Sequence, residues 1–141
     1  MARQNIRKIL VPLDGSKNSM RGLDEAISIA KKCNASITGL YVTPITPPKS
    51  DEQISYVEKY LLKNAQKFMI KAKKRSTQHG IEFKDKVLYG DEGETIVKYA
   101  KKNFDMIVIG SRGLSAVKEF FLGSTSNHVL HKSKTPVMVV K

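Results

Sequence analysis

The chain has 141 residues, of which 40% are hydrophobic and 27% are charged, and its formal net charge at pH 7 is +12. This length and composition suit one folded domain with its own core, and they exclude a disordered chain. The single cysteine excludes a framework of internal disulfides, and no apolar stretch is long enough to span a membrane.

The N-terminal part of the chain predicts a strand, a helix and a second strand. Ile9–Val11 is a compact apolar run closed by turn residues, which indicates a buried strand. Apolar residues recur at helical spacing through Met20–Ala30, and Ser16 and Asn18 are both candidates to cap that helix. The segment Ile37–Val42 is rich in β-forming residues and predicts the next strand.

A loop and a long amphipathic helix are predicted next. Thr43–Ser55 is rich in proline and polar residues, and we expect it to be the mobile part of the molecule. Tyr56–Gln78 predicts a helix with one apolar face and one basic face. The apolar face carries Leu61, Ala65, Phe68 and Ala72, and the basic face carries Lys59, Lys63, Lys67, Lys71 and Lys74.

The C-terminal part predicts three further strands separated by two short helices. Glu82–Tyr89 alternates weakly, as an outer strand does, and a helix around Ile96–Ala100 follows it. Asp105–Gly110 is a continuous apolar run, which suits a strand buried on both faces. A helix through Val129 and Leu130 precedes a last strand, Val137–Val140.

Strands and helices therefore alternate from a first strand to a last one. This order predicts an α/β fold of three layers, in which helices cover both faces of an open, five-stranded parallel sheet, as in Rossmann-like proteins. No internal repeat or low-complexity segment interrupts it, so we expect residues 1–141 to form a single domain.

A glycine- and hydroxyl-rich pattern follows the most apolar strand. Gly110-Ser111-Arg112-Gly113 stands directly after it, and Gly123-Ser124-Thr125-Ser126 opens the next helix, in the spacing G-x2-G-x9-G-S. Glycine lets a ligand approach bare backbone, and a helix N-terminus offers free N–H groups with partial positive charge. The three hydroxyls are further donors. The pattern favours a phosphate site, although a plain strand–loop–helix connection uses the same residue types.

Asp14 ends the first strand as Gly110 ends the fourth. If those strands are neighbours, both residues face one crevice at the carboxyl ends of the strands, where open α/β sheets bind ligands. Two simpler interpretations stay open, because Asp14 is also a possible helix cap and Arg112 a possible partner in a surface ion pair.

These residues together resemble the universal stress protein family. The likeness runs from Ile6 to Val140 and rests on the Val11–Ser16 turn, Val42, Gly90-Asp91 and the G-x2-G-x9-G-S stretch. The resemblance implies the strand order 3-2-1-4-5. It also implies the ATP-binding subclass, because this glycine motif distinguishes members that bind ATP from members that do not.

The resemblance also implies a site for ATP, or for ADP or AMP, with Mg²⁺ accompanying ATP. Asp14 is expected near the ribose, the base or the divalent ion, and the backbone of Val42 near adenine. Arg112 adds a possible bidentate phosphate contact. The nucleotide-binding residues expected in this way are Pro12, Leu13, Asp14, Val42, Gly110, Arg112, Gly113, Gly123, Ser124, Thr125 and Ser126.

Two other phosphate-binding motifs are missing from the sequence. There is no G-x-x-x-x-G-K-[ST], so no Walker-type lysine holds the β- and γ-phosphates, and there is no G-x-G-x-x-G at the first helix, so a dinucleotide site is disfavoured. We therefore expect a stress-response or signalling module that acts through nucleotide occupancy, with no assigned catalytic residue. A slow ATP-hydrolysing or transferring enzyme is the alternative. His128 and His131 are three residues apart, which is compatible with metal binding, but solvated histidines are the simpler interpretation. We interpret Cys33 as a packing residue.

Partners and location can be stated only as expectations. The basic N-terminus is followed by no long apolar run, so we expect no signal peptide and a cytoplasmic protein. The resemblance implies a homodimer, which would cover the apolar edge strand Val137–Val140. A signalling partner protein is expected but not identified. Nucleic acid is a disfavoured partner, because we expect no aromatic residues interleaved on the same helical face as the Lys59–Lys74 stripe, and so no rings for bases to stack on.

Overall fold

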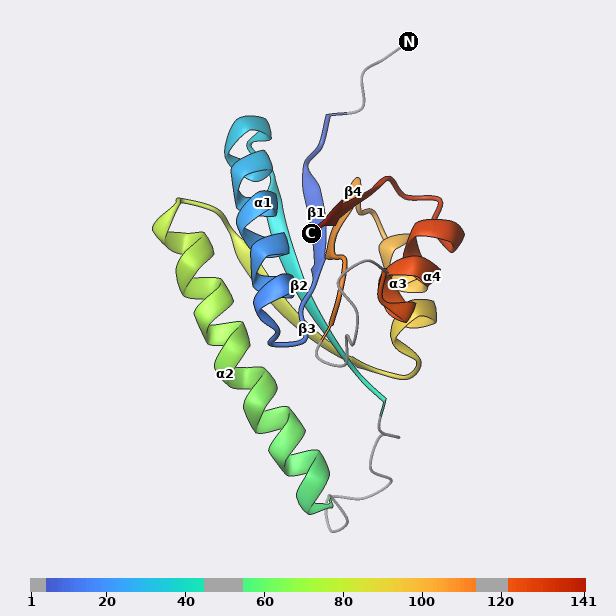
Figure 1. The fold of residues 1–141 in the computed structure, drawn as a ribbon. Coiled ribbons are helices and arrows are strands. Elements are labelled where there is room, and N and C mark those ends of the chain that lie inside the picture. Colours follow the sequence, from blue (N-terminus) through green and yellow to red (C-terminus); the bar gives the residue numbers. More distant parts are fainter. Residues whose placement is uncertain (1–4, 45–54, 114–121) are drawn as a thin grey trace.

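The computed structural model describes residues 5–44, 55–113 and 122–141. They form a five-stranded parallel sheet in the order β3-β2-β1-β4-β5 (Figure 1), which confirms the predicted architecture. The elements are β1 (Lys8–Pro12), α1 (Lys17–Cys33), β2 (Ser36–Thr43), α2 (Tyr56–Gln78), β3 (Phe83–Tyr89), α3 (Glu92–Ala100), β4 (Met106–Gly110), α4 (Ser124–Lys132) and β5 (Val137–Val140).

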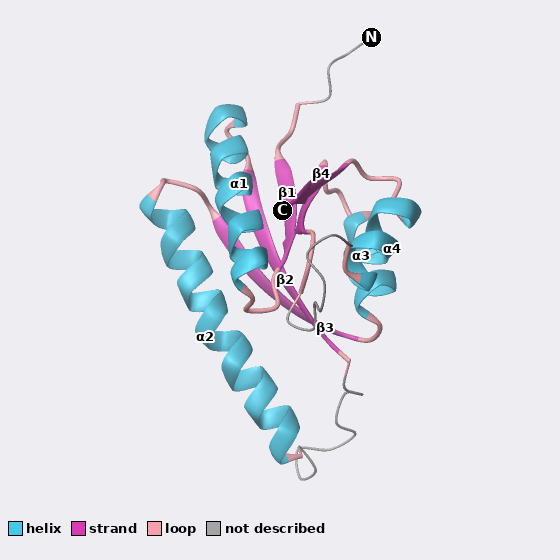
Figure 2. Ribbon diagram, in the orientation of Figure 1, coloured by secondary structure: helices cyan, strands magenta, loops and turns pink. Residues whose placement is uncertain are grey.

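Two helical layers cover the sheet. Helices α1 and α2 lie on one face, and α3 and α4 lie on the other (Figure 2). The core is divided in the same way, because Ile9 and Val11 of β1 pack into the α1–α2 side while Leu10 packs into the α3–α4 side. All three side chains are completely buried. The central strands are therefore apolar on both faces, as a parallel sheet between two layers of helices requires.

The start of α1 resolves the choice between its two candidate caps. The Ser16 hydroxyl accepts a hydrogen bond from the backbone N–H of Ser19 at 3.1 Å, so Ser16 is the N-cap. Asn18 is buried instead and makes tertiary contacts. At the other end, Asn34 adopts a left-handed conformation (φ 57°) and its N–H bonds to the carbonyl of Ala30.

One interpretation of the sequence is wrong. Cys33 is exposed and does not pack into the core. The whole last turn of α1, from Lys31 to Asn34, is exposed, so the apolar stripe of this helix stops at Ala30.

Two predicted features lie largely or wholly outside the described residues. These are the interior of the Thr43–Ser55 loop, residues 45–54, and the segment 114–121 within the glycine motif. Among the described helices, none combines the length and the apolar character that crossing a lipid bilayer requires.

Candidate functional site

A cavity of about 580 Å³ opens where the carboxyl ends of β1, β2 and β4 meet. Strand β1 lies between β2 and β4, so the strand order reverses at β1. The carboxyl ends of the strands at such a switch point are where open α/β sheets bind ligands. The volume falls within the range of about 300–1,000 Å³ that small-molecule sites occupy. All the residues expected from the sequence line this cavity, namely Pro12, Leu13, Asp14, Val42, Gly110, Arg112, Gly113, Gly123, Ser124, Thr125 and Ser126.

One part of the cavity wall is apolar. It is formed by Leu13 after β1, Leu40 and Val42 of β2, Ile96 of α3 and Phe68 of α2. These side chains belong to both halves of the core, so they are held in place by packing rather than by the pocket itself. A flat, uncharged group such as an aromatic base fits this kind of wall.

The start of α4 forms a polar part of the wall. Its N-cap is Gly123, which has no side chain and therefore makes no side-chain cap hydrogen bond. The other described helices begin with a side chain that accepts from the first turn, supplied by Ser16, Ser55 and Asp91. The first-turn amides of α4 thus have no side-chain oxygen to bond to, and this turn lies in the wall of the cavity. This leaves donors and a positive helix end for an anionic ligand.

The hydroxyls of this turn behave differently from the expectation. Thr125 donates to the Glu92 carboxylate at 2.7 Å, and Ser126 donates to the carbonyls of Ser111 at 2.9 Å and Gly123 at 3.0 Å. A hydroxyl has one proton to give, so both are directed at protein oxygens. Ser124 is exposed. The donors that this turn leaves for a ligand are therefore the Ser124 hydroxyl and the backbone amides.

The two glycines after β4 differ in their roles. A Cβ at Gly110 would lie 2.5 Å from the Asn18 Oδ1 and 3.0 Å from the Asn18 carbonyl oxygen. Gly110 is therefore a packing glycine that lets α1 approach the sheet. A Cβ at Gly113 would meet only the tip of the Asp14 carboxylate, at 2.7 Å from Oδ2. Gly113 is exposed, and it is here that bare backbone faces the pocket.

Asn18 holds the loop after β4 in position. Its Oδ1 accepts from the backbone N–H of Arg112 at 2.7 Å, and its Nδ2 donates to the carbonyl of Val140 at 3.3 Å. One buried amide therefore ties the start of α1 to the pocket loop and to the end of β5. The backbone N–H of Arg112 is thereby committed to Asn18, so only its side chain remains for a ligand.

Two carboxylates line the pocket, Asp14 and Glu92. Asp14 Oδ1 accepts from the backbone N–H of Ser16 at 2.9 Å, which shapes the turn before α1 and is not a helix cap. Among the described residues there is no cluster of three or more acidic, histidine or cysteine side chains that could hold a metal. Mg²⁺ is commonly bound by one or two carboxylates together with substrate phosphates. Asp14 could supply the carboxylate, and a bound phosphate would have to supply the other ligands.

Tyr41 borders the cavity from β2. Burial raises the pKa of its hydroxyl above the ordinary value of 10.0, a hydrogen bond with Thr43 lowers it, and the charges of Glu92 and Asp14 raise it further. The ring makes an edge-on contact with Phe68, with centroids 5.5 Å apart. Tyr41 is therefore a neutral hydrogen-bonding group in the pocket wall.

The sequence did not single out several wall residues. Tyr41, Asn64, Phe68 and Glu92 line the cavity, although no motif marks them. Phe68 was recognised only as part of an apolar helix face, and Glu92 stands one residue after the Asp91 cap. The two histidines considered as metal ligands differ in their surroundings: His128 packs against Gly93, where a Cβ would lie 2.7 Å from its ring, and His131 is exposed.

Comparisons with known proteins extend over nearly the whole chain. The model of the Universal stress protein family matches residues 5–141. The universal stress protein YxiE of Bacillus subtilis is 32% identical over 145 residues, which cover 95% of this chain and 98% of that protein. The structure of the universal stress protein UspA from Lactobacillus plantarum is similar with a TM-score of 0.82 at 26% identity, covering 99% of this chain and 100% of that one. A universal stress protein in complex with cAMP has a TM-score of 0.79 at 25% identity, covering 98% and 99%.

Proposed function

The chain belongs to the universal stress protein family, and we propose that its pocket binds an adenine nucleotide, with ATP as the expected ligand. The observation that carries this proposal is a helix N-terminus without a side-chain cap in the wall of a cavity that also has an apolar side. Helix N-termini bind phosphate through backbone N–H groups and the helix dipole, and apolar walls suit a base.

The phosphate chain would lie against Gly113 and the first turn of α4. The groups available there are the backbone amides of that turn, the Ser124 hydroxyl and the Arg112 guanidinium. Hydrogen bonds to charged acceptors contribute about 1.5–3 kcal/mol each. Together with burial of the base against the apolar wall, they offset the free-energy cost of association.

The nucleoside would lie against the apolar wall beside β2. In this arrangement the Val42 backbone contacts adenine, and Asp14 accepts from ribose or holds Mg²⁺ bound to the phosphates. The solved relative in complex with cAMP, at 25% identity, supports an adenine nucleotide as the ligand class. Mg²⁺ would offset the repulsion between the phosphates and Asp14.

We further propose that nucleotide occupancy is the signal and that turnover is slow or absent. Fast phosphoryl transfer needs an oriented nucleophile and several groups that neutralise charge, and among the described pocket residues Arg112 is the single cation. A cytoplasmic partner protein would read the occupied state, because a ligand shifts a conformational equilibrium only through unequal affinity for two states.

The proposed assembly is a homodimer that pairs along β5, the last strand of the sheet. The carbonyls of Pro136 and Val140 bond to β4. Because backbone groups alternate along a strand, Val137 and Val139 direct theirs to the opposite side. A second copy related by a two-fold axis would complete those hydrogen bonds.

Isothermal titration calorimetry tests the proposed function. ATP, ADP, AMP and GTP are titrated with and without Mg²⁺, and phosphate release is followed in parallel. We expect micromolar binding of ATP, weaker binding of GTP, and little phosphate release over hours. Absence of heat with all the adenine nucleotides at millimolar concentration would refute the proposal, and rapid phosphate release would favour the enzyme alternative.

A further inference from the structure

The positive charge of the protein is concentrated in one helical layer. Helices α1 and α2 carry eleven basic and three acidic residues, so their net charge is +8. Helices α3 and α4 carry two basic and two acidic residues, so they are neutral. Solubility is favoured by a net charge far from zero, which does not require the charge to be gathered on one layer of helices.

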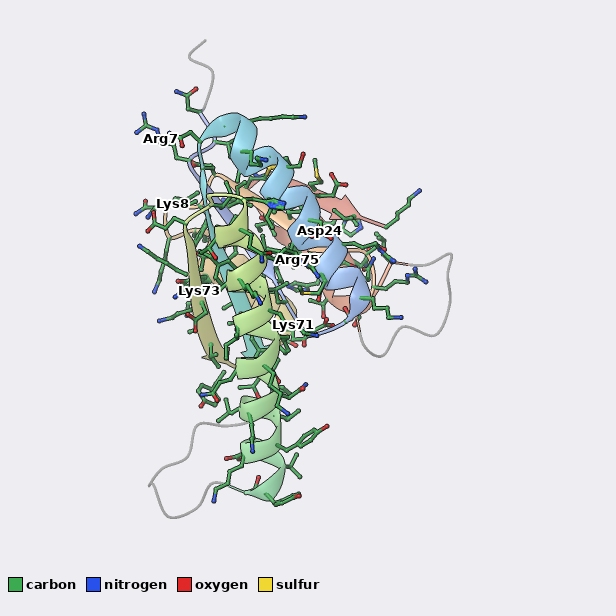
Figure 3. All side chains as sticks on the ribbon, turned by 90° about the vertical axis from the view of Figure 1, so that its left-hand side faces the viewer. Arg7, Lys8, Asp24, Lys71, Lys73 and Arg75 are labelled. Atoms are coloured by element: carbon green, nitrogen blue, oxygen red, sulfur yellow. The ribbon has the colours of Figure 1, made fainter. Side chains whose placement is uncertain are left out.

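The two basic helices enclose a groove. It has a volume of about 350 Å³ and lies on the outer side of the α1–α2 layer. Lys17 and Arg21 line it from α1, and Lys71 and Arg75 line it from α2. Figure 3 looks onto this face and shows Lys71 and Arg75 on α2 beside α1.

The groove holds little negative charge. Its one acidic lining residue is Asp24, and the Asp24 Oδ1 is 3.0 Å from the Arg75 Nη1. Lys17, Arg21 and Lys71 are exposed, and none of them forms an ion pair within the described part of the chain. Three cations from two different helices therefore point to an anionic ligand that enters between the helices.

The residue types distinguish among anionic partners. Protein interfaces are depleted in lysine, whereas lysine is the commonest charged residue of these two helices. The exposed rings of α2, Tyr56 and Tyr60, lie in its first two turns and do not line the groove. A membrane surface binds helices that insert an apolar side. The apolar stripe of α2, with Ala65, Phe68, Met69 and Ala72, is buried against the sheet. The exposed apolar residues of this helix are interspersed with its lysines and form no separate apolar side; they are Tyr56, Val57, Tyr60 and Ile70. No exposed ring lines the groove on which the bases of a single strand would stack.

We propose that the α1–α2 face binds the phosphate backbone of double-stranded nucleic acid without reading its sequence. Helix α2 has 23 residues, so it is about 35 Å long, close to one turn of a duplex. Lysines along the helix neutralise phosphates and release counterions, and the groove cations fix the position of one backbone. The Lys59–Lys74 stripe is thus one half of a two-helix surface, which its sequence did not reveal.

This surface is distinct from the nucleotide pocket. Phe68 lines both cavities, but it is only 8% exposed and separates them as a wall. The groove is therefore a separate cavity, and the proposal does not depend on nucleotide binding.

Fluorescence anisotropy with a labelled 20-base-pair duplex tests the proposal in 25–200 mM salt. The groove variant combines Lys17→Gln, Arg21→Gln and Lys71→Gln. The matched control combines Lys98→Gln, Lys101→Gln and Lys102→Gln, three exposed residues in or after α3. We expect the groove variant to bind at least about tenfold more weakly at 100 mM salt, and its log–log salt slope to fall by about 2.7, which is 0.9 for each lost phosphate contact. The control should bind within about threefold of the unaltered protein.

Four outcomes would overturn the proposal. They are no duplex binding by the unaltered protein at 25 mM salt, equal weakening in the two variants, equal affinity for polyglutamate or anionic vesicles, and displacement of the duplex by saturating ATP. The last outcome would place the duplex in the nucleotide pocket. A circular dichroism spectrum and a Tm equal to those of the unaltered protein show that the groove variant is folded.

Discussion

The two glycines after β4 allow stability and ligand binding to be separated by single substitutions. In Gly110→Ala, the new methyl carbon would lie 2.5 Å from the Asn18 Oδ1 and 3.0 Å from its backbone carbonyl oxygen. Backbone at that distance cannot move aside cheaply, so α1 must shift. In Gly113→Val, the new side chain meets only the Oδ2 end of the Asp14 side chain and no backbone, and then extends into the pocket.

The expected effects follow from these contacts. Overpacking of a buried site costs about 1–3 kcal/mol. For a domain of this size that lowers the Tm of Gly110→Ala by about 3–10 °C. Gly113→Val should keep the Tm within about 2 °C, because its site is exposed. It should lose at least two hydrogen bonds to phosphate, or about 3 kcal/mol, which is about a hundredfold in Kd.

Differential scanning calorimetry and isothermal titration with ATP measure the two effects. Asn127→Ala, an exposed change on α4 outside the pocket, is the control for both. Equal ATP affinity of Gly113→Val and the unaltered protein would exclude phosphate binding beside Gly113. Equal stability of Gly110→Ala and the unaltered protein would exclude the tight contact between Gly110 and Asn18.

Three further predictions concern other parts of the structure. Asn18→Asp keeps the acceptor for the Arg112 N–H but places a carboxylate beside the Val140 carbonyl. It should lower the Tm by several degrees while ATP still binds, and equal Tm values would contradict the contact with Val140. Because the pKa of Tyr41 is raised, its contribution to the free energy of unfolding is complete below pH 10 and declines as pH rises through its folded pKa. Urea titrations from pH 8 to 11 should therefore show a steeper loss of stability for the unaltered protein than for Tyr41→Phe. Parallel curves for the two proteins would contradict the raised pKa. Val139→Pro removes a donor on the open side of β5, so light scattering should show a monomer, and an unchanged dimer mass would exclude pairing along this edge.

Much of the fold was predictable because it depends on local patterns. The apolar run Ile9–Val11 and the run ending at Gly110 have no polar position, which marks strands covered on both sides. The strand order came from the family resemblance, since periodicity does not determine which strands are neighbours. The resemblance also led to the pocket residues, and the structure brings them together around one cavity.

The remaining features depend on contacts between distant segments. Asn18 lies 94 residues from Arg112 and 122 residues from Val140, and nothing in the local sequence marks it as a link. The direction of the Thr125 hydroxyl is set by Glu92 on another helix. The exposure of Cys33 depends on where the last turn of α1 leaves the sheet, which helical spacing alone does not show.

A crystal structure of the protein grown with ATP and Mg²⁺ would show where the nucleotide binds. We expect phosphate density within hydrogen-bonding distance of the Gly113 backbone and the first-turn amides of α4, with the base against the β2 wall. An empty cavity at millimolar ATP, or a nucleotide bound elsewhere on the molecule, would contradict this expectation.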